Sequence, residues 1–269
     1  MASPLLSVLI AGHSFVKSLH SDLQRKFDLR AAVDFNLTQT ATVSLHGISG
    51  LTVPRLAREL RLLFAHHPPP RVIILEIGTN DLSSQSPEVV IGELLDLVDF
   101  LQSVDSSTAV GVCKVLPRRH RSTGLPQEDF NNRAATFNKM LEALFDDRQF
   151  VFVWRHLEMQ SLSRRVLLPD GVHLNRHGQY CLYRSYRGAI LKGVSLLSNS
   201  LVYEMFVCRE LRSHVYDFPQ SMLSFHDLNH FYLLTFYVGC CTGQCTNDEF
   251  TFVERVTTKL APFMSSIHL

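Results

Sequence analysis

Five short apolar runs predict buried β-strands in this chain. They are rich in Val, Ile, Leu and Phe and lie at residues 7–11, 41–45, 72–77, 109–116 and 150–154. The stretches between them carry apolar side chains at the spacing of an amphipathic helix, namely Leu56, Leu60 and Leu63, then Leu94, Leu97, Val98 and Leu101, then Phe137, Leu141 and Leu144. Because strand and helix alternate, we expect a parallel sheet with helices on both faces.

The alternating pattern ends near residue 194. Residues 175–193 have the composition of a closing helix, and Gly193 stands where a helix C-terminus often carries glycine. From Val194 onward the chain is rich in Phe, Tyr, His and Cys but has no clean helical or strand period. The pattern predicts a domain at residues 1–194, followed by a C-terminal extension at residues 195–269 with no assigned packing or function.

Composition and charge favour a soluble globular protein and give no general signal for binding nucleic acid or membranes. Apolar residues make up 46% of the 269 residues and charged residues 19%, which allows a sizeable core and excludes intrinsic disorder. The 26 basic and 25 acidic side chains give a net charge of +1, so the chain as a whole has no field that would attract nucleic acid or an anionic membrane.

The cysteines and the N-terminus favour a cytoplasmic location. None of the six cysteines precedes Cys113, which is unlike the disulfide framework of a secreted domain. The first apolar run lacks the preceding positive charges of a signal peptide, and cleavage after it would remove the first predicted strand. No uninterrupted apolar stretch approaches the roughly 18 residues needed for a transmembrane helix.

Polar residues and glycine follow the predicted strands at the positions where ligands bind in open parallel sheets. Ser14 follows the first strand, Gly50 the second and Asn80 the third, while Asp170 and His173 come after the fifth. Since the carboxyl ends of parallel strands share one edge of the sheet, we expect these residues to converge there.

The residue types at this edge are those of a serine hydrolase. A serine hydroxyl is a weak nucleophile until a neighbouring base takes its proton, and the base needs a third group to fix its orientation. Ser14, His173 and Asp170 can supply these three roles. Taken one at a time, a serine or an Asn-Asp pair after a strand is more often a helix cap or a turn residue, so the joint arrangement carries the hypothesis.

Four sequence blocks resemble those of the SGNH (GDSL-type) hydrolases. The blocks are Gly12-His13-Ser14-Phe15-Val16, Ile48-Ser49-Gly50, Gly78-Thr79-Asn80-Asp81 and Asp170-Gly171-Val172-His173, in the family's order. The resemblance implies a three-layer α/β/α fold with a five-stranded parallel sheet of flavodoxin-like order. The first and last blocks, with the segment from Leu182 to Leu191, also resemble the esterase domains associated with animal LINE-type retrotransposons.

The resemblance implies a role for each site residue. Ser14 is the expected nucleophile, His173 the general base and Asp170 the residue that orients His173. The backbone N–H groups of Ser14 and Gly50 and the side-chain amide of Asn80 form the expected oxyanion hole. The implied reaction is hydrolysis of acetyl or other short-chain esters, or of lysophospholipids, without a metal or an organic cofactor.

Two further residues support this expected site. Asp81 is expected to stabilise the loop that carries Asn80. His13 stands where the family usually has Asp, and its imidazole could brace the nucleophile loop, titrate near Ser14, or simply be satisfied in the core. On the sequence alone, His13→Asp is predicted to retain or raise activity.

Two other groups of residues have a functional alternative. The basic residues at 118–121 follow the fourth strand; we expect a solvated loop, with binding of an anionic head group as the alternative. In the extension, His226, His230, Cys240, Cys241 and Cys245 are residue types that can bind zinc, but their spacing fits no standard site, so no metal is expected.

Two rival functions remain open at this stage. One is a non-catalytic module that keeps the fold and binds an acylated lipid or glycan, which the His13 departure would permit. The other is a hydrolase domain whose site is masked by the extension.

Overall fold

Five parallel strands form one sheet. The computed structural model describes residues 5–28, 30–119, 125–159 and 165–213, and of residues 199–213 it describes only the backbone. The strands are β1 (Leu6–Gly12), β2 (Ala41–Gly47), β3 (Val72–Glu76), β4 (Ala109–Cys113) and β5 (Val151–Trp154). Their order is β2-β1-β3-β4-β5, with every neighbouring pair parallel, which confirms the predicted flavodoxin-like sheet.

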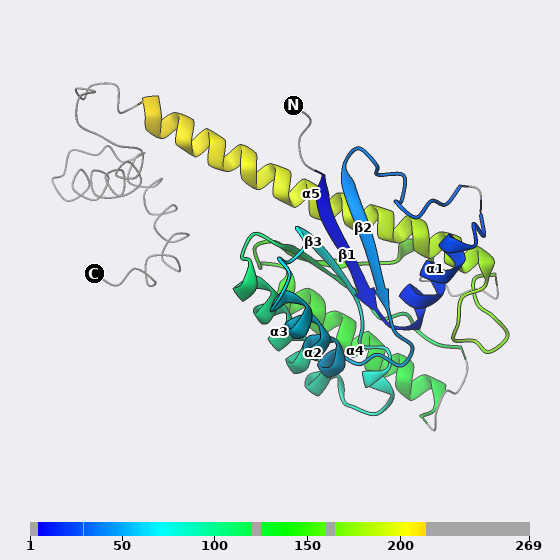
Figure 1. Cartoon of the computed structure of the whole chain (residues 1–269). Coiled ribbons are helices and arrows are strands. Elements are labelled where there is room, and N and C mark those ends of the chain that lie inside the picture. The colour runs from blue at the N-terminus through cyan, green and yellow to red at the C-terminus, as the bar shows by residue number, and fades with distance from the viewer. Residues whose placement is uncertain (1–4, 29, 120–124, 160–164, 214–269) are drawn as a thin grey trace. The chain divides into compact units, whose positions relative to one another are not determined.

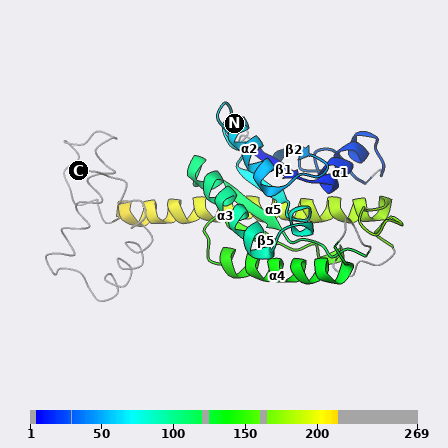
Figure 2. The ribbon, with the colours of Figure 1, turned by 90° about the horizontal axis from the view of Figure 1, so that it is seen from below.

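Helices cover both faces of this sheet (Figure 1). They are α1 (Ser14–Gln24), α2 (Val53–Phe64), α3 (Pro87–Val104), α4 (Gln127–Phe145) and α5 (Arg176–Ser213), with short 3-10 turns η1 (Asp81–Ser83) and η2 (Leu157–Met159). Helices α2, α3 and α4 pack in one apolar cluster and α1 and α5 in another, on the opposite face. Helix α1 lies beside β2 in both views (Figure 1 and Figure 2). The predicted three-layer architecture is confirmed.

The apolar runs are continuous because both faces of each central strand are buried. In β1, Val8 and Ile10 belong to the cluster with α1 and α5, whereas Leu9 and Ala11 belong to the cluster on the other face. All five residues of β3 are buried, and the last of them is a glutamate, Glu76. A strand buried on both sides has no polar face, so its sequence does not alternate.

The prediction that the closing helix ends near Gly193 is wrong. Helix α5 begins at Arg176 and continues to Ser213. A Cβ atom at Gly193 would lie 2.6 Å from Cγ1 of Val72, so glycine at this position allows close packing of the helix on β3. Here the missing side chain serves helix–sheet contact and does not mark a helix C-terminus.

All strands belong to one compact unit, Met1–Phe206. The domain boundary expected near residue 194 falls within α5. Most of the expected extension, residues 214–269, lies outside the described residues, and so do the five His and Cys residues considered above as zinc ligands.

Candidate active site

The predicted site residues follow the carboxyl ends of the strands. Ser14 is the first residue of α1, two positions after β1 ends, and its side chain is half-buried. Gly50 follows β2, and Asn80 follows β3 at the start of η1. The sheet topology therefore brings these loops to one edge. The N-terminal end of a helix favours developing negative charge, so the place of Ser14 suits chemistry that forms an oxyanion.

Asp170 holds His173 in one orientation. Its Oδ2 atom lies 2.7 Å from Nδ1 of His173, and its Oδ1 atom accepts hydrogen bonds of 2.9 Å from the backbone N–H groups of Val172 and His173. Burial alone would raise the pKa of Asp170, but these hydrogen bonds hold it below its usual value. With the Nδ1 proton directed at Asp170, the Nε2 atom of His173 is left as the acceptor of a neutral imidazole.

Ser14 and His173 are not joined by a hydrogen bond in the described part of the chain. The loop that carries Asp170 and His173 is held at the same edge of the sheet, because the N–H of Arg119, in the segment after β4, donates a hydrogen bond of 3.0 Å to the carbonyl of Gly171. The structure thus brings Asp170 and His173 into contact, and it places Ser14 two positions after the end of β1, at that edge. Hydrogen bonds between catalytic groups are often long without substrate and shorten in the complex.

The loops after β2 and β3 are tied together by Asn80 and Asp81. The Asn80 amide donates a hydrogen bond of 2.8 Å to the carbonyl of Leu51, the residue after Gly50. Asp81 is buried and accepts a hydrogen bond of 2.9 Å from the N–H of Val53, at the first residue of α2. Burial raises the pKa of Asp81. These contacts hold the Asn80 side chain near the exposed Gly50. Among the described residues, the second N–H of the Asn80 amide donates no hydrogen bond.

Gly50 adopts a conformation that favours glycine. Its φ angle is +70°, in the left-handed region, and a Cβ atom there would meet no other atom within 4 Å. Backbone geometry, and not lack of space, is the reason for glycine at this position. The open surroundings leave the Gly50 N–H approachable from solvent.

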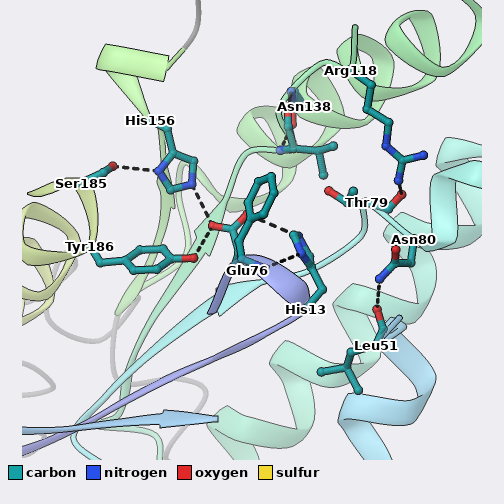
Figure 3. Close-up of polar contacts among 12 residues, drawn as sticks. His13, Leu51, Glu76, Thr79, Asn80, Arg118, Asn138, His156, Ser185 and Tyr186 are labelled. Carbon is teal, nitrogen blue, oxygen red and sulfur yellow. Dashed lines mark hydrogen bonds and ion pairs between the residues drawn. The ribbon is translucent and has the colours of Figure 1, made fainter. Parts of the chain in front are cut away.

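A buried polar cluster at the end of β3 was not predicted from the sequence. At its centre is Glu76, the last residue of β3, whose Oε2 atom accepts hydrogen bonds from His156 Nε2 at 2.8 Å and from the Tyr186 hydroxyl at 3.0 Å (Figure 3). His156 Nδ1 lies 2.8 Å from Oγ of Ser185. Burial raises the pKa of Glu76, but His156, through its charge and its hydrogen bond, holds the pKa below the usual value.

His13 lies against this cluster and caps α1. Its Nδ1 atom accepts a hydrogen bond of 3.4 Å from the N–H of Phe15, and its Nε2 atom is 3.7 Å from Oε1 of Glu76. The side chain is buried, and burial lowers its pKa to about 4 despite the opposing effect of Glu76. A pKa of about 4 conflicts with the idea that His13 titrates near neutral pH. The contacts of His13 agree with the idea that it braces the nucleophile loop.

The Glu76 cluster also contains a combination of side chains that can bind metals. Potential ligand atoms of Glu76, Cys113 and His156 lie within 4.8 Å of one another. Hydrogen bonds already join Glu76 to His156 and Tyr186. Burial, followed by the charge of Glu76, raises the pKa of the Cys113 thiol well above its usual value and disfavours the thiolate that binds a metal. We therefore describe the cluster as a hydrogen-bonded network and assign it no metal.

Arg118 corrects the prediction of a solvated basic loop. It is only 8% exposed, and its guanidinium donates hydrogen bonds of 2.9 Å to the Thr79 carbonyl and to the Ser83 hydroxyl. The guanidinium also stacks on Phe130, with its carbon 4.0 Å from the ring centroid. Arg118 thus supports the loop that carries Asn80 (Figure 3). Residues 120 and 121 of the predicted basic loop lie outside the described residues.

Two further observations concern possible ligands and membranes. A hollow of about 250 Å³ lies between the end of β4 and α4, lined in part by Leu116, Ala134 and Asn138. Ser14 and His173 do not line it, so we give it no part in the chemistry.

Among the helices that the structure describes, none is long and apolar enough to cross a membrane.

Comparison with protein families identifies one match. The sequence profile described as the GDSL-like lipase/acylhydrolase family matches residues 11–180, which contain Ser14, Gly50, Asn80, Asp170 and His173. A search of curated proteins finds no significant match.

Several solved structures share the fold at low sequence identity. A GDSL-like lipase from Bacteroides thetaiotaomicron is 18% identical with a TM-score of 0.55, and the match covers 71% of this chain and 92% of that one. An acetyl esterase mutant with a bound acetate ion is 13% identical with a TM-score of 0.54, covering 71% and 99%. The esterase EstA from Pseudoalteromonas sp. is 17% identical with a TM-score of 0.51, covering 70% and 98%. At these identities the matches show the fold alone.

Proposed function

Since the chain belongs to the GDSL-like lipase/acylhydrolase family, we propose that it hydrolyses carboxylic esters through an acyl-enzyme on Ser14. The observation that carries the proposal is the contact of 2.7 Å between Asp170 and His173. It leaves Nε2 of His173 as the proton acceptor at the edge of the sheet where Ser14 begins α1. A base in this state is what a serine nucleophile requires.

The proposed reaction has two halves. His173 Nε2 takes the Ser14 hydroxyl proton as Oγ attacks the ester carbonyl, and the tetrahedral intermediate collapses when the carbon–alkoxide bond breaks and the alkoxide takes that proton. A water molecule then attacks the acyl-enzyme while His173 accepts its proton. The bond to Ser14 breaks, the proton returns to Oγ, and the carboxylic acid leaves.

The proposed oxyanion hole comprises the N–H groups of Ser14 and Gly50 and the side chain of Asn80. Two observations support it: the hydrogen bond from Asn80 to Leu51, and the exposure of Gly50 to solvent. Preorganised donors stabilise the charge that develops on the carbonyl oxygen, and one such donor is worth about 10² to 10³ in turnover in other hydrolases.

We propose short-chain esters as the substrates. The side chains of Asp170 and His173 are 46% and 48% exposed, and Gly50 is exposed, so these residues of the proposed site are open to solvent. The solved structures named above include an acetyl esterase, which supports the same substrate class. The resemblance to LINE-associated esterase domains rests on the sequence blocks alone and agrees with this activity.

The direct test is hydrolysis of p-nitrophenyl esters of two to twelve carbons, and of a lysophospholipid, by the purified full chain. We expect turnover that is fastest with acetate or butyrate and is lost in Ser14→Ala. Ser18→Ala, on the same helix, is the matched control and should retain turnover. If neither the wild-type chain nor the control exceeds the buffer rate while both are folded, the non-catalytic binding module replaces the proposal.

A further inference from the structure

The side chain at position 13 faces a buried carboxylate. Glu76 enters the cluster from β3, the strand next to β1, and its Oε1 atom is the oxygen directed at His13. Both side chains are almost fully buried, at 2% and 3% exposure. In the SGNH pattern, which usually has Asp before the nucleophile, the carboxylate belongs to position 13 itself. Here a carboxylate faces position 13 but comes from the neighbouring strand.

The contacts of His13 define its tautomer. Its Nδ1 atom accepts from the N–H of Phe15, so in the neutral imidazole the proton is on Nε2, which points at Glu76. His156 and Tyr186 hold the other carboxylate oxygen and thereby fix where Glu76 lies. The charge on Glu76 thus favours the tautomer in which His13 can cap the helix that begins with Ser14.

We propose that His13 and Glu76 are a matched pair of positioning residues: the Glu76 carboxylate aligns a neutral cap at position 13, and the site does not accept a second carboxylate there. This inference deepens the proposed function because the capped turn carries Ser14. It also reverses the prediction from the sequence alone that His13→Asp retains or raises activity. That prediction assumed that the chain lacks a carboxylate at this position. In the structure, an Asp at position 13 would face the Glu76 carboxylate, and the two would repel each other.

The other groups around His13 offset this repulsion only in part. Arg118 keeps its positive charge, because its acceptors Thr79 and Ser83 are neutral, but its charge affects the pKa of His13 less than the charge of Glu76 does. His156 already bonds to Glu76. His173 is paired with Asp170. The remaining ionisable neighbours of Glu76 are Cys113 and Tyr186, a thiol and a phenol that ionise only to anions and so cannot supply positive charge. Burial raises the pKa of each well above its usual value and keeps both neutral.

The pH dependence of His13→Asp has a definite sign. Two buried carboxylates in contact share one proton, so the folded protein would retain a proton that the unfolded chain has lost. A group whose pKa is raised by folding contributes stability at low pH that is lost as the pH rises. The variant should therefore become less stable between pH 5 and pH 8. Wild-type His13 is neutral over this range, because burial lowers its pKa to about 4.

The test is the melting temperature of the full chain between pH 5 and pH 8. It is measured for His13→Asp and for its neutral match His13→Asn, each alone and each together with Glu76→Gln. Asn caps helices as well as Asp does and has nearly the same shape, so the two variants differ mainly in charge. At pH 8 we expect His13→Asp to melt roughly 5 °C or more below His13→Asn, and this gap to narrow at pH 5 and in the Glu76→Gln background.

Two results would overturn the inference. One is equal melting of His13→Asp and His13→Asn at pH 8, and the other is a gap between them that persists unchanged with Glu76→Gln. If His13→Asp does not fold at pH 8, its recovery in the double variant supports the pair and continued failure contradicts it. Melting does not require catalysis, so the outcome is independent of the proposed function; where turnover is measurable, the turnover of His13→Asp should fall with pH in the same way.

Discussion

Two carboxylate–imidazole pairs lie at the same edge of the sheet, and they differ mainly in their exposure to solvent. Asp170 and His173 are 2.7 Å apart, with side chains 46% and 48% exposed. Glu76 and His156 are 2.8 Å apart, with side chains 3% and 0% exposed. Residue types and distances are nearly the same. The exposed pair can exchange protons with a substrate and with water, whereas the buried pair can only hold its neighbours in place.

The two environments also imply different costs of mutation. A pair in contact with water contributes about 0 to 1 kcal/mol to stability, because solvent screens both charges. Removing one partner of a buried pair costs about 3 to 5 kcal/mol, because it leaves an uncompensated charge in the interior. Replacing His173 should therefore mainly lower turnover, whereas the same replacement of His156 should mainly lower stability.

The largest effect is expected from His173→Ala on ester hydrolysis. Loss of the proposed base should lower kcat by about 10⁶, because catalysis then depends on the oxyanion donors and on binding alone. The melting temperature should change by no more than about 2 °C, since the lost pair is exposed.

The matched control for this variant is His177→Ala, an exposed histidine in the first turn of α5. It should retain turnover. If both variants lose turnover to a similar extent, His173 has no special role as the base. If His173→Ala melts far below the wild type, the exposed pair stabilises the fold.

The next effect is expected from His156→Ala on stability. The buried Glu76 carboxylate would lose the hydrogen bond from His156, and the melting temperature should fall by roughly 10 °C. Turnover per folded molecule should fall much less than in His173→Ala, because His156 holds Glu76 and does not contact a reacting atom. If His156→Ala melts like the wild type, the buried pair of Glu76 and His156 does not stabilise the fold.

The fold was predictable because its central strands, β1, β3 and β4, are buried on both faces and appear in the sequence as uninterrupted apolar runs. The edge strands β2 and β5 are only partly buried, but they were located as well. Strand β4 ends at Cys113 instead of continuing to residue 116. The end of α5 was not predictable. Gly193 is compatible with both a helix end and a close helix–sheet contact, and only the position of Val72 distinguishes them.

The exposed site could be proposed from the sequence, whereas the buried cluster could not. Ser14, Asn80, Asp170 and His173 form short blocks beside strand ends, so their order alone indicates one site. Glu76 is a single charge within an apolar run, and its partner Tyr186 is 110 residues away. A carboxylate in a fully buried strand is itself a signal, because such a charge is rarely unpaired, but its partners follow only from the tertiary structure.

The central claim is that Ser14 at the exposed pair is the nucleophile, and covalent labelling tests it most directly. The wild-type chain would be treated with an alkyl fluorophosphonate, in which the Ser14 Oγ–phosphorus bond forms as fluoride leaves, and the labelled peptide would be identified by mass spectrometry. The account predicts one adduct, on Ser14, that is retained in Ser18→Ala and forms much more slowly in His173→Ala. A folded chain that forms no adduct, or one that is labelled at another residue, would contradict it.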